Sequence, residues 1–237
     1  MKKILFLLFL IGCGTEDMSD LDIVGGQKVY RSWYGRVGGC GSTLIAPYNK
    51  KKTLVQAFSK WAVSAAHCFG KSKPREVRFG LYQRKDGNGG KPMQTVKVKR
   101  IIKHPEWTGN RGYDLALIEL ESRVKFKPRQ LTNATPSDSA KLSAFGFGQT
   151  SHPGSAPEFL QGAVFRFNAK ATKNSRKEII RASAPGKAVC FGDSGGPLMY
   201  NGKLIATATF TTGNCKAGGQ MGFTRVDIPW IKRVVGL

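Results

Sequence analysis

Short apolar or alternating runs, separated by glycine-rich loops, make up most of the sequence after residue 22. The runs have the length of strands, and long amphipathic helices are hard to find. The clearest runs are Val96–Lys99, Leu115–Leu120, Val164–Phe167 and Leu204–Phe210. The chain holds 29 glycines, more than a helical bundle uses, and its loops are rich in Gly, Asn, Lys and Pro. This pattern predicts antiparallel sheets in an all-β sandwich or barrel.

Two segments differ from this pattern. The polar stretch 128–141 contains two prolines and few large apolar residues, so it is the best candidate for a connection between two halves. Near the C-terminus, Asp227 can cap a helix in which Ile228, Ile231 and Val235 share one face.

The composition excludes several classes of protein. With 41% hydrophobic residues the chain is too apolar to be disordered. A net charge of +23, from 38 Lys and Arg against 15 Asp and Glu, argues against a neutral cytosolic housekeeping enzyme. The five cysteines form no CxxC pair and the three histidines are widely separated, so we expect no metal site.

Residues 1–13 resemble an export signal. Lys2 and Lys3 precede an apolar run over 4–11 that is too short to span a bilayer and has the length of a signal-peptide core. A buried helix of the fold is the alternative. The run ends in a sequence similar to the cleavage box of bacterial lipoproteins, in which the cysteine, here Cys13, carries the lipid that attaches the protein to a membrane. An ordinary secretory signal with an incidental cysteine remains open.

Either signal predicts an exported protein, extracellular or in a bacterial cell envelope, whose cysteines can pair. Residues 14–22 carry four acids and no base, which predicts an acidic linker or propeptide. Because these acids and two lysines precede Ile23, the body over 23–237 carries a net charge of +25. Four cysteines remain in the body, and three pairings are open from the sequence alone: Cys40, Cys68, Cys190 and Cys215.

One set of residues could carry acyl transfer, which needs a hydroxyl beside a base, a carboxylate to orient the base, and N–H groups aimed at the oxyanion. A serine lies among glycines in Gly192–Leu198, and a histidine precedes a cysteine in Val63–Cys68. Tyr113–Ile118 places Asp114 at the start of an apolar strand, where burial is costly unless the carboxylate is paired. Ile23–Gly26 supplies a sequence that a cut could turn into a new N-terminus.

These four motifs, in this order, resemble those of the chymotrypsin and trypsin family of serine endopeptidases. The resemblance covers Ile23 to the terminal helix. It implies two six-stranded antiparallel β-barrels with a short C-terminal helix, protein or peptide substrates, and no cofactor. His104 and His152, each beside a proline, are interpreted as structural.

The resemblance assigns roles by motif. His67 is the expected general base, Asp114 its orienting carboxylate and Ser194 the nucleophile. The N–H groups of Gly192 and Ser194 are the expected oxyanion hole. Removing one such donor typically costs about 3 kcal/mol of transition-state stabilisation, so the loop geometry matters as much as the three side chains.

The family pattern also implies the pairings Cys40 with Cys68 and Cys190 with Cys215. It further implies a zymogen, activated by a cut before Ile23 that frees an ammonium to pair with Asp193. Asp22 precedes the cut where many members have Arg or Lys, so the activating protease stays unidentified. A cut there would also separate the body from a lipid on Cys13, and we hypothesise that activation and release are one event.

The residues expected to line the substrate pocket are identified by their distance in sequence from the family motifs. Ala188 stands where trypsin-like members keep an aspartate for basic side chains, and Thr211 and Met221 stand where open-pocket members often have glycine. This arrangement resembles elastase-type members and predicts cleavage after small or medium apolar residues.

The excess positive charge has two interpretations. It is either a solvated surface or a means of attracting anionic cell-envelope polymers or acidic substrates. No base-reading motif supports specific nucleic-acid binding. The rival to the peptidase is a catalytically idle relative that binds anionic surfaces, and the intact His67, Asp114 and Ser194 argue against it. The natural substrate and the oligomeric state do not follow from the sequence.

Overall fold

The structure, a computed structural model, describes residues 24–46, 58–70, 74–84, 88–109, 112–212, 215 and 218–235. The predicted signal peptide, Cys13, the acidic segment and Ile23 lie outside the described residues. Within the described part the chain forms thirteen strands and two α-helices. No helix of this part is long and apolar enough to cross a membrane.

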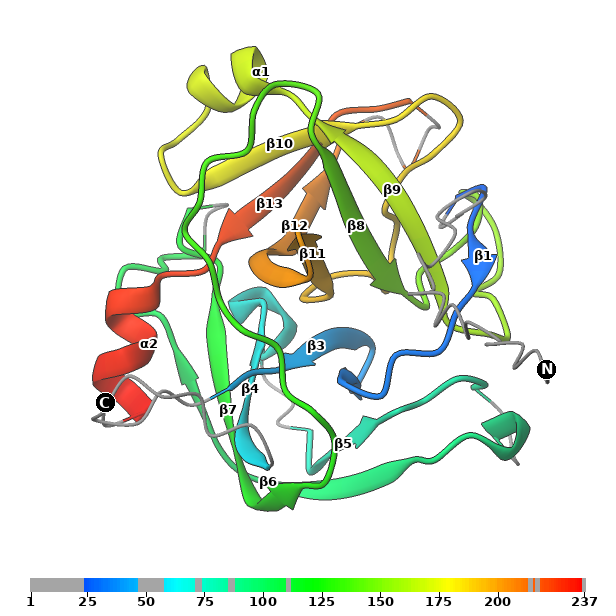
Figure 1. Ribbon diagram of the computed structural model, residues 1–237, viewed down its shortest axis with the longest axis vertical. Coiled ribbons are helices and arrows are strands. Elements are labelled where there is room, and N and C mark those ends of the chain that lie inside the picture. The colour runs from blue at the N-terminus through cyan, green and yellow to red at the C-terminus, as the bar shows by residue number, and fades with distance from the viewer. Residues whose placement is uncertain are drawn as a thin grey trace, which may run out of the picture.

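The first half of the chain closes into a barrel of six antiparallel strands, here barrel one, in the order β2-β3-β4-β7-β6-β5 (Figure 1). A 3-10 helix at Ala66–Cys68 follows β4, and a second one, Asn88–Gly90, precedes β6. The strands are β2 (Tyr34–Val37), β3 (Cys40–Leu44), β4 (Ser59–Ser64), β5 (Glu76–Phe79), β6 (Gln94–Lys103) and β7 (Ala116–Val124).

The second half forms barrel two, in which β8 pairs with both β11 and β9 and so closes the ring β8-β9-β10-β13-β12-β11. The short β1 (Gln27–Lys28) adds to the outside of β9. Helix α1 (Ala169–Lys173) lies between β9 and β10, and α2 (Ile228–Val235) ends the chain beside barrel one (Figure 1). The strands are β8 (Lys141–Gly146), β9 (Gln161–Phe167), β10 (Ile179–Ser183), β11 (Pro197–Tyr200), β12 (Lys203–Thr211) and β13 (Met221–Arg225).

This architecture confirms the predicted fold of two six-stranded antiparallel barrels with a short C-terminal helix. The four runs singled out in the sequence lie on β6, β7, β9 and β12. Alternation arises because one strand face packs inward, whereas the first five residues of β7, four of them apolar, are buried on both faces.

The polar segment between β7 and β8 connects the two barrels, as predicted. In Figure 1 it crosses the face of the molecule from the lower barrel to the upper one. Its backbone is bonded to both: Arg129 N–H donates to Leu44 O at 2.9 Å, and Thr132 N–H donates to Leu204 O at 2.9 Å. The connecting segment is therefore fixed to β3 on one side and to β12 on the other.

The C-terminal helix is attached to barrel one through its cap. Asp227 Oδ1 accepts the N–H of Trp230 at 2.9 Å, as the sequence predicted for a capping aspartate. The other carboxylate oxygen lies 3.1 Å from Nε2 of the buried His104, whose ring stacks on Tyr113 and packs against Trp230. His104 thus has a packing environment that accounts for it structurally.

One buried carboxylate fixes three cations on the wall of barrel one. The side chain of Glu119, 3% exposed, accepts from Lys60 at 2.8 Å, Lys99 at 3.2 Å and Arg100 at 2.5 Å. These hydrogen bonds, opposed by the cost of burial, lower the pKa of Glu119 to about 2.

We expect the stability contribution of Glu119 to depend on pH. Its pKa is lower in the folded chain than in the unfolded one, so the contribution is complete above about pH 5 and disappears as the pH falls toward 2. Glu119→Gln should lower the free energy of unfolding at pH 7 by about 1 to 3 kcal/mol and flatten its acid dependence, measured by urea unfolding. Glu121→Gln, an exposed position on the same strand, is the control. Equal pH profiles in the two variants would contradict the assignment.

Candidate active site

The register of two strands brings His67 and Asp114 together. Ser64 on β4 pairs with Ala116 on β7. Just beyond this pair, His67 lies in the 3-10 helix that follows β4, and Asp114 lies two residues before the start of β7. Asp114 Oδ1 accepts the backbone N–H of His67 at 2.8 Å, and Oδ2 lies 2.6 Å from His67 Nδ1. The aspartate side chain is 2% exposed and the histidine side chain 39%.

This pair can hold an imidazole in one tautomer. A carboxylate only accepts hydrogen bonds, so the contact keeps the proton on His67 Nδ1 and leaves Nε2 as the acceptor. A histidine oriented in this way can take a proton from a hydroxyl and bear the resulting positive charge beside the aspartate.

The serine lies on a loop of barrel two that is bonded to barrel one. Gly41 N–H on β3 donates to Ser194 O at 2.8 Å, while Ser64 Oγ on β4 donates to Gly41 O at 2.7 Å. A Cβ at Gly41 would lie 2.8 Å from the Cα of Gly196, so only glycine allows this close approach. The contact places Ser194 opposite the 3-10 helix that carries His67.

Within residues 192–196 of this loop, two N–H groups have no acceptor among the described residues. Gly192 and Gly195 have φ of +101° and +73°, in the range that favours glycine. The N–H groups of Asp193, Gly195 and Gly196 donate to backbone carbonyls, whereas no described residue accepts from the N–H groups of Gly192 and Ser194. Two such free donors on one turn are what a developing oxyanion requires.

Ser194 and His67 line the same cavity, which has a volume of about 370 Å³. Among the described contacts no hydrogen bond joins Ser194 Oγ to the His67 ring. Catalytic hydrogen bonds are often longer in a substrate-free site and shorten when substrate binds. The structure therefore places two of the three predicted side chains, those of His67 and Ser194, at one cavity, while the third, the buried Asp114, is hydrogen-bonded to His67.

Asp193 is buried behind this loop. Its carboxylate accepts the N–H groups of Gly148 and Cys190, each at 2.8 Å. Burial raises the pKa of Asp193 to about 7, and the two backbone hydrogen bonds only partly oppose this effect. Its predicted partner Ile23 lies outside the described residues. The next residue, Val24, donates its N–H to Ala188 O at 3.1 Å.

Two disulfides brace the site, Cys40–Cys68 beside the histidine and Cys190–Cys215 beside the serine loop. These are the pairs that the family resemblance implied. Their sequence separations of 28 and 25 residues correspond to roughly 3 to 4 kcal/mol of chain entropy each. The sulfurs of Cys40 and Cys68 also lie near His67, but they are bonded to each other and offer no thiolate to a metal.

The predicted substrate-pocket residues divide into two groups. Thr211 lines the cavity, together with its strand neighbours Thr209 and Phe210. Ala188 and Met221 do not line it and are fully buried in the core of barrel two, which corrects their predicted position. The reason is local: Met221 Sδ accepts the N–H of Val189 at 3.1 Å, and this contact holds its side chain behind the cavity wall.

Comparison with known sequences places this geometry in a family. The family model described as Trypsin matches residues 53–231, most of the chain. The chain belongs to the trypsin family. Granzyme M from Rattus norvegicus is 31% identical over 77% of this chain and 78% of its own length. Chymotrypsin-like elastase family member 1 from Canis lupus familiaris is 28% identical over 97% of this chain and 99% of its own length.

A solved structure agrees with this membership. Neuropsin, a serine protease expressed in the limbic system of mouse brain, superposes with a TM-score of 0.72 over 86% of this chain and 94% of its own. At 24% identity this likeness shows the shared fold. As a trypsin-family member the chain is a serine protease, whose substrates are proteins or peptides.

An aromatic pair that the sequence motifs did not predict lies at the rim of the trypsin-family site. Phe191 lines the cavity and is 55% exposed, and its ring packs on His152 with the centroids 4.8 Å apart. Gln149 N–H donates to Phe191 O at 2.9 Å, so the loop after β8 supports this rim. The signal for this rim in the sequence was a phenylalanine directly before Gly192.

We expect Gly148→Ala to disable the serine loop without unfolding the protein. A Cβ at position 148 would overlap the carboxylate of Asp193, so the carboxylate must move and shift the loop that carries Ser194. The expected effect is a tenfold or larger fall in the rate of labelling by a serine-directed phosphonate. Gly39→Ala is the matched control, because a Cβ there meets nothing within 4 Å. Unchanged labelling in the Gly148 variant would contradict this account of the loop.

Proposed function

We propose that this protein is a serine endopeptidase that uses Ser194 as nucleophile, His67 as general base and Asp114 as orienting carboxylate. The observation that carries the proposal is the 2.6 Å contact between His67 Nδ1 and Asp114 Oδ2 beside a cavity that His67 shares with Ser194. The trypsin-family membership supports the same roles.

In the proposed reaction Ser194 Oγ attacks the carbonyl carbon of a peptide bond while its proton passes to His67 Nε2. The carbonyl oxygen becomes an oxyanion and accepts from the N–H groups of Gly192 and Ser194. The C–N bond then breaks, and the proton on His67 passes to the leaving amine. Water repeats the sequence on the acyl-enzyme, releases the acid and restores the serine.

The cavity walls support cleavage after small or medium apolar residues. Val189, Ala208 and Phe210 give them an apolar surface. The one described carboxylate among the lining residues belongs to Asp193, and it is already held by backbone N–H groups. A basic substrate side chain would therefore enter without a partner for its charge, which disfavours trypsin-like specificity.

Activation by a cut before Ile23 belongs to the same proposal. Asp193 is a buried carboxylate whose described hydrogen-bond partners are backbone N–H groups, and Val24 is bonded to Ala188 near the serine loop. A new ammonium at Ile23 would have a short path to that carboxylate and would compensate for its burial. The activating protease stays unidentified.

Export is supported by the two disulfides, which persist in oxidising compartments. The signal peptide over 1–13, the acidic segment 14–22 and the lipid on Cys13 stay predictions, because residues 1–23 lie outside the described residues.

The catalytic set is tested with a serine-directed phosphonate on the processed protein. Covalent labelling is expected at Ser194 and should disappear in Ser194→Ala. Asp114→Asn should lower kcat on a peptide substrate by about 10⁴, since the imidazole then favours the wrong tautomer. Asp138→Asn is the control, because this exposed carboxylate caps α1.

The same experiment separates the peptidase from an idle relative that binds anionic surfaces. Absence of labelling in processed protein, or labelling that persists in Ser194→Ala, would refute the proposed mechanism. A peptide cleaved after valine or alanine should be preferred over one cleaved after lysine, and the reverse preference would refute the specificity alone.

Cutting before Ile23 is expected to change how stability depends on pH. In the uncut chain the folded pKa of Asp193, about 7, lies above its ordinary value. Its stability contribution is therefore complete below about pH 4 and is lost as the pH rises through 7. After cutting, the ammonium favours the charged carboxylate, so the loss between about pH 4 and 7 should disappear.

Urea unfolding of cut and uncut chains measures this difference, in a Ser194→Ala background that prevents self-digestion. The difference between them should be on the order of a few kcal/mol at pH 8, and Asp193→Asn should abolish it. Parallel pH profiles for cut and uncut chains would show that the ammonium does not reach Asp193.

A further inference from the structure

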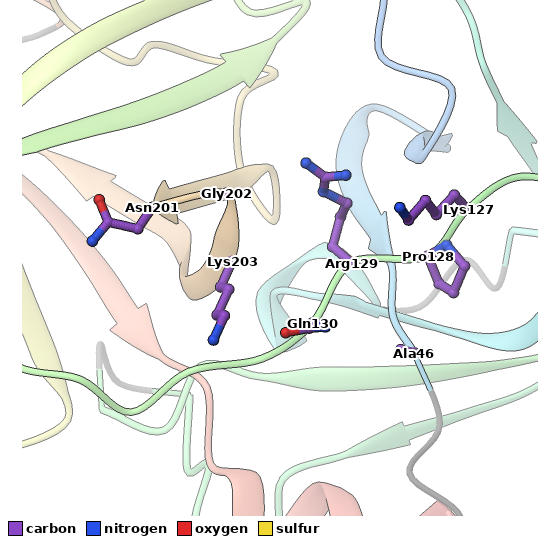
Figure 2. Close-up of a pocket in the computed structure, with 8 residues that line it drawn as sticks. All are labelled: Ala46, Lys127, Pro128, Arg129, Gln130, Asn201, Gly202 and Lys203. Atoms are coloured by element: carbon purple, nitrogen blue, oxygen red, sulfur yellow. The ribbon is translucent and has the colours of Figure 1, made fainter. Parts of the chain in front are cut away.

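Two adjoining cavities lie along the connecting segment and share no lining residue with the active-site cavity. Their volumes are about 240 and 630 Å³, and both are lined by Lys127, Arg129, Asn201 and Gly202. Figure 2 shows the smaller one, between the connecting segment and the turn that joins β11 to β12. Together they form one continuous depression, here called the basic groove.

Five cations line the basic groove, and no Asp or Glu is among its described lining residues. The cations are Arg31, Lys127, Arg129, Lys141 and Lys203. In Figure 2 the side chains of Lys127 and Arg129 rise from the same side of the connecting segment, while Lys203 extends the other way. Arg31, Lys141 and Lys203 stand apart from Lys127 and Arg129 in the sequence, so the fold assembles this concentration of charge.

Aromatic rings hold the two guanidinium groups in place. Arg129 lies over Trp33 at 5.1 Å from the ring centroid, and Arg31 lies over Phe145 at 5.0 Å. The two rings themselves form an edge-to-face pair at 5.4 Å. A guanidinium stacked on a ring is held in a fixed plane, which lowers the entropy cost of ordering it beside an anion. Arg31 Nη1 also donates to Tyr30 O at 3.0 Å, which fixes this side chain further.

The backbone under the groove is also fixed. Ala46 N–H donates to Arg129 O at 2.9 Å, and Leu204 N–H donates to Gln130 O at 2.8 Å. Arg129 and Lys203 are therefore held relative to each other through the two barrels, and binding an anion here requires little ordering of the main chain.

We propose that the basic groove is a binding site for a linear phosphate polymer, separate from the active site. The two cavities share four lining residues and together hold five cations, which fits a chain of repeated anions better than one small anion. The concave shape fits a chain better than a flat lipid surface.

The aromatic residues favour a polymer without bases over single-stranded nucleic acid. Nucleic-acid grooves offer exposed rings on which bases stack. Here Trp33 and Phe145 are each only 5% exposed and carry the guanidinium groups. The lining also holds Tyr30, whose hydroxyl donates to Pro92 O at 2.7 Å, so the groove offers five cations and one partly exposed ring.

The test compares two triple variants of equal net charge. Lys127→Gln, Lys141→Gln and Lys203→Gln remove three groove cations, while Lys97→Gln, Lys170→Gln and Lys173→Gln remove three exposed cations elsewhere. Binding of fluorescent inorganic polyphosphate is measured by anisotropy on the full chain carrying Ser194→Ala. Circular dichroism checks that both variants fold.

The groove variant should bind about tenfold or more weakly than the parent, and its salt slope should fall by about two. The control variant should change binding less than about threefold. Equal weakening in both variants would overturn the proposal, because overall charge alone would then explain binding. Neither result depends on catalysis, so failure here leaves the proposed peptidase intact.

Competition separates the phosphate sources. Unlabelled polyphosphate should displace the probe more effectively than a single-stranded oligothymidine with the same number of phosphates or vesicles of anionic lipid. Stronger displacement by the oligothymidine would overturn the proposal in favour of nucleic acid. Displacement only by vesicles would overturn it in favour of a membrane surface.

Discussion

The contact between Gly41 and Ser194 is the interaction on which the site depends. His67 and Asp114 belong to barrel one, and Ser194 belongs to barrel two, so no local sequence can align them. The 2.8 Å hydrogen bond from Gly41 N–H to Ser194 O joins the two barrels at the reacting residue itself. Ser64 fixes the same glycine from β4. The absence of a side chain at Gly41 is therefore a requirement of the site's geometry.

The serine loop depends in turn on the buried carboxylate of Asp193. Asp193 accepts one hydrogen bond from Cys190, three residues earlier in the same loop, and one from Gly148 in the segment after β8. Burying this carboxylate in its charged form costs free energy, and the raised pKa of Asp193 reflects that cost. A site built in this way responds to any positive charge that reaches the carboxylate.

Much of the fold could be predicted from the sequence, because strand length and alternation are local properties. The runs at Val96–Lys99 and Leu204–Phe210 lie on strands, and Asp227 caps the last helix. The position of Met221 could not be predicted, because it depends on a contact with Val189 thirty-two positions away. The order of the motifs identified the residues of the site, and strand register explained why His67 meets Asp114.

The basic groove is a second feature that could not be predicted from the sequence, because it depends on contacts between distant segments. Lys127 and Arg129 stand close together in the sequence, but Arg31, Lys141 and Lys203 reach them only through strand pairing and the crossing of the connecting segment. The sequence gives a net charge of +23, but it does not show where the fold concentrates the positive charge.

The anchoring of the connecting segment has a consequence for the integrity of the molecule. Its bonds to β3 and β12 are complete at Thr132, before the exposed stretch 133–135 begins. The peptide link beyond that point is not what aligns the barrels. A cut there would leave both sets of bonds intact, and exposed stretches of this kind are where chains tolerate cleavage.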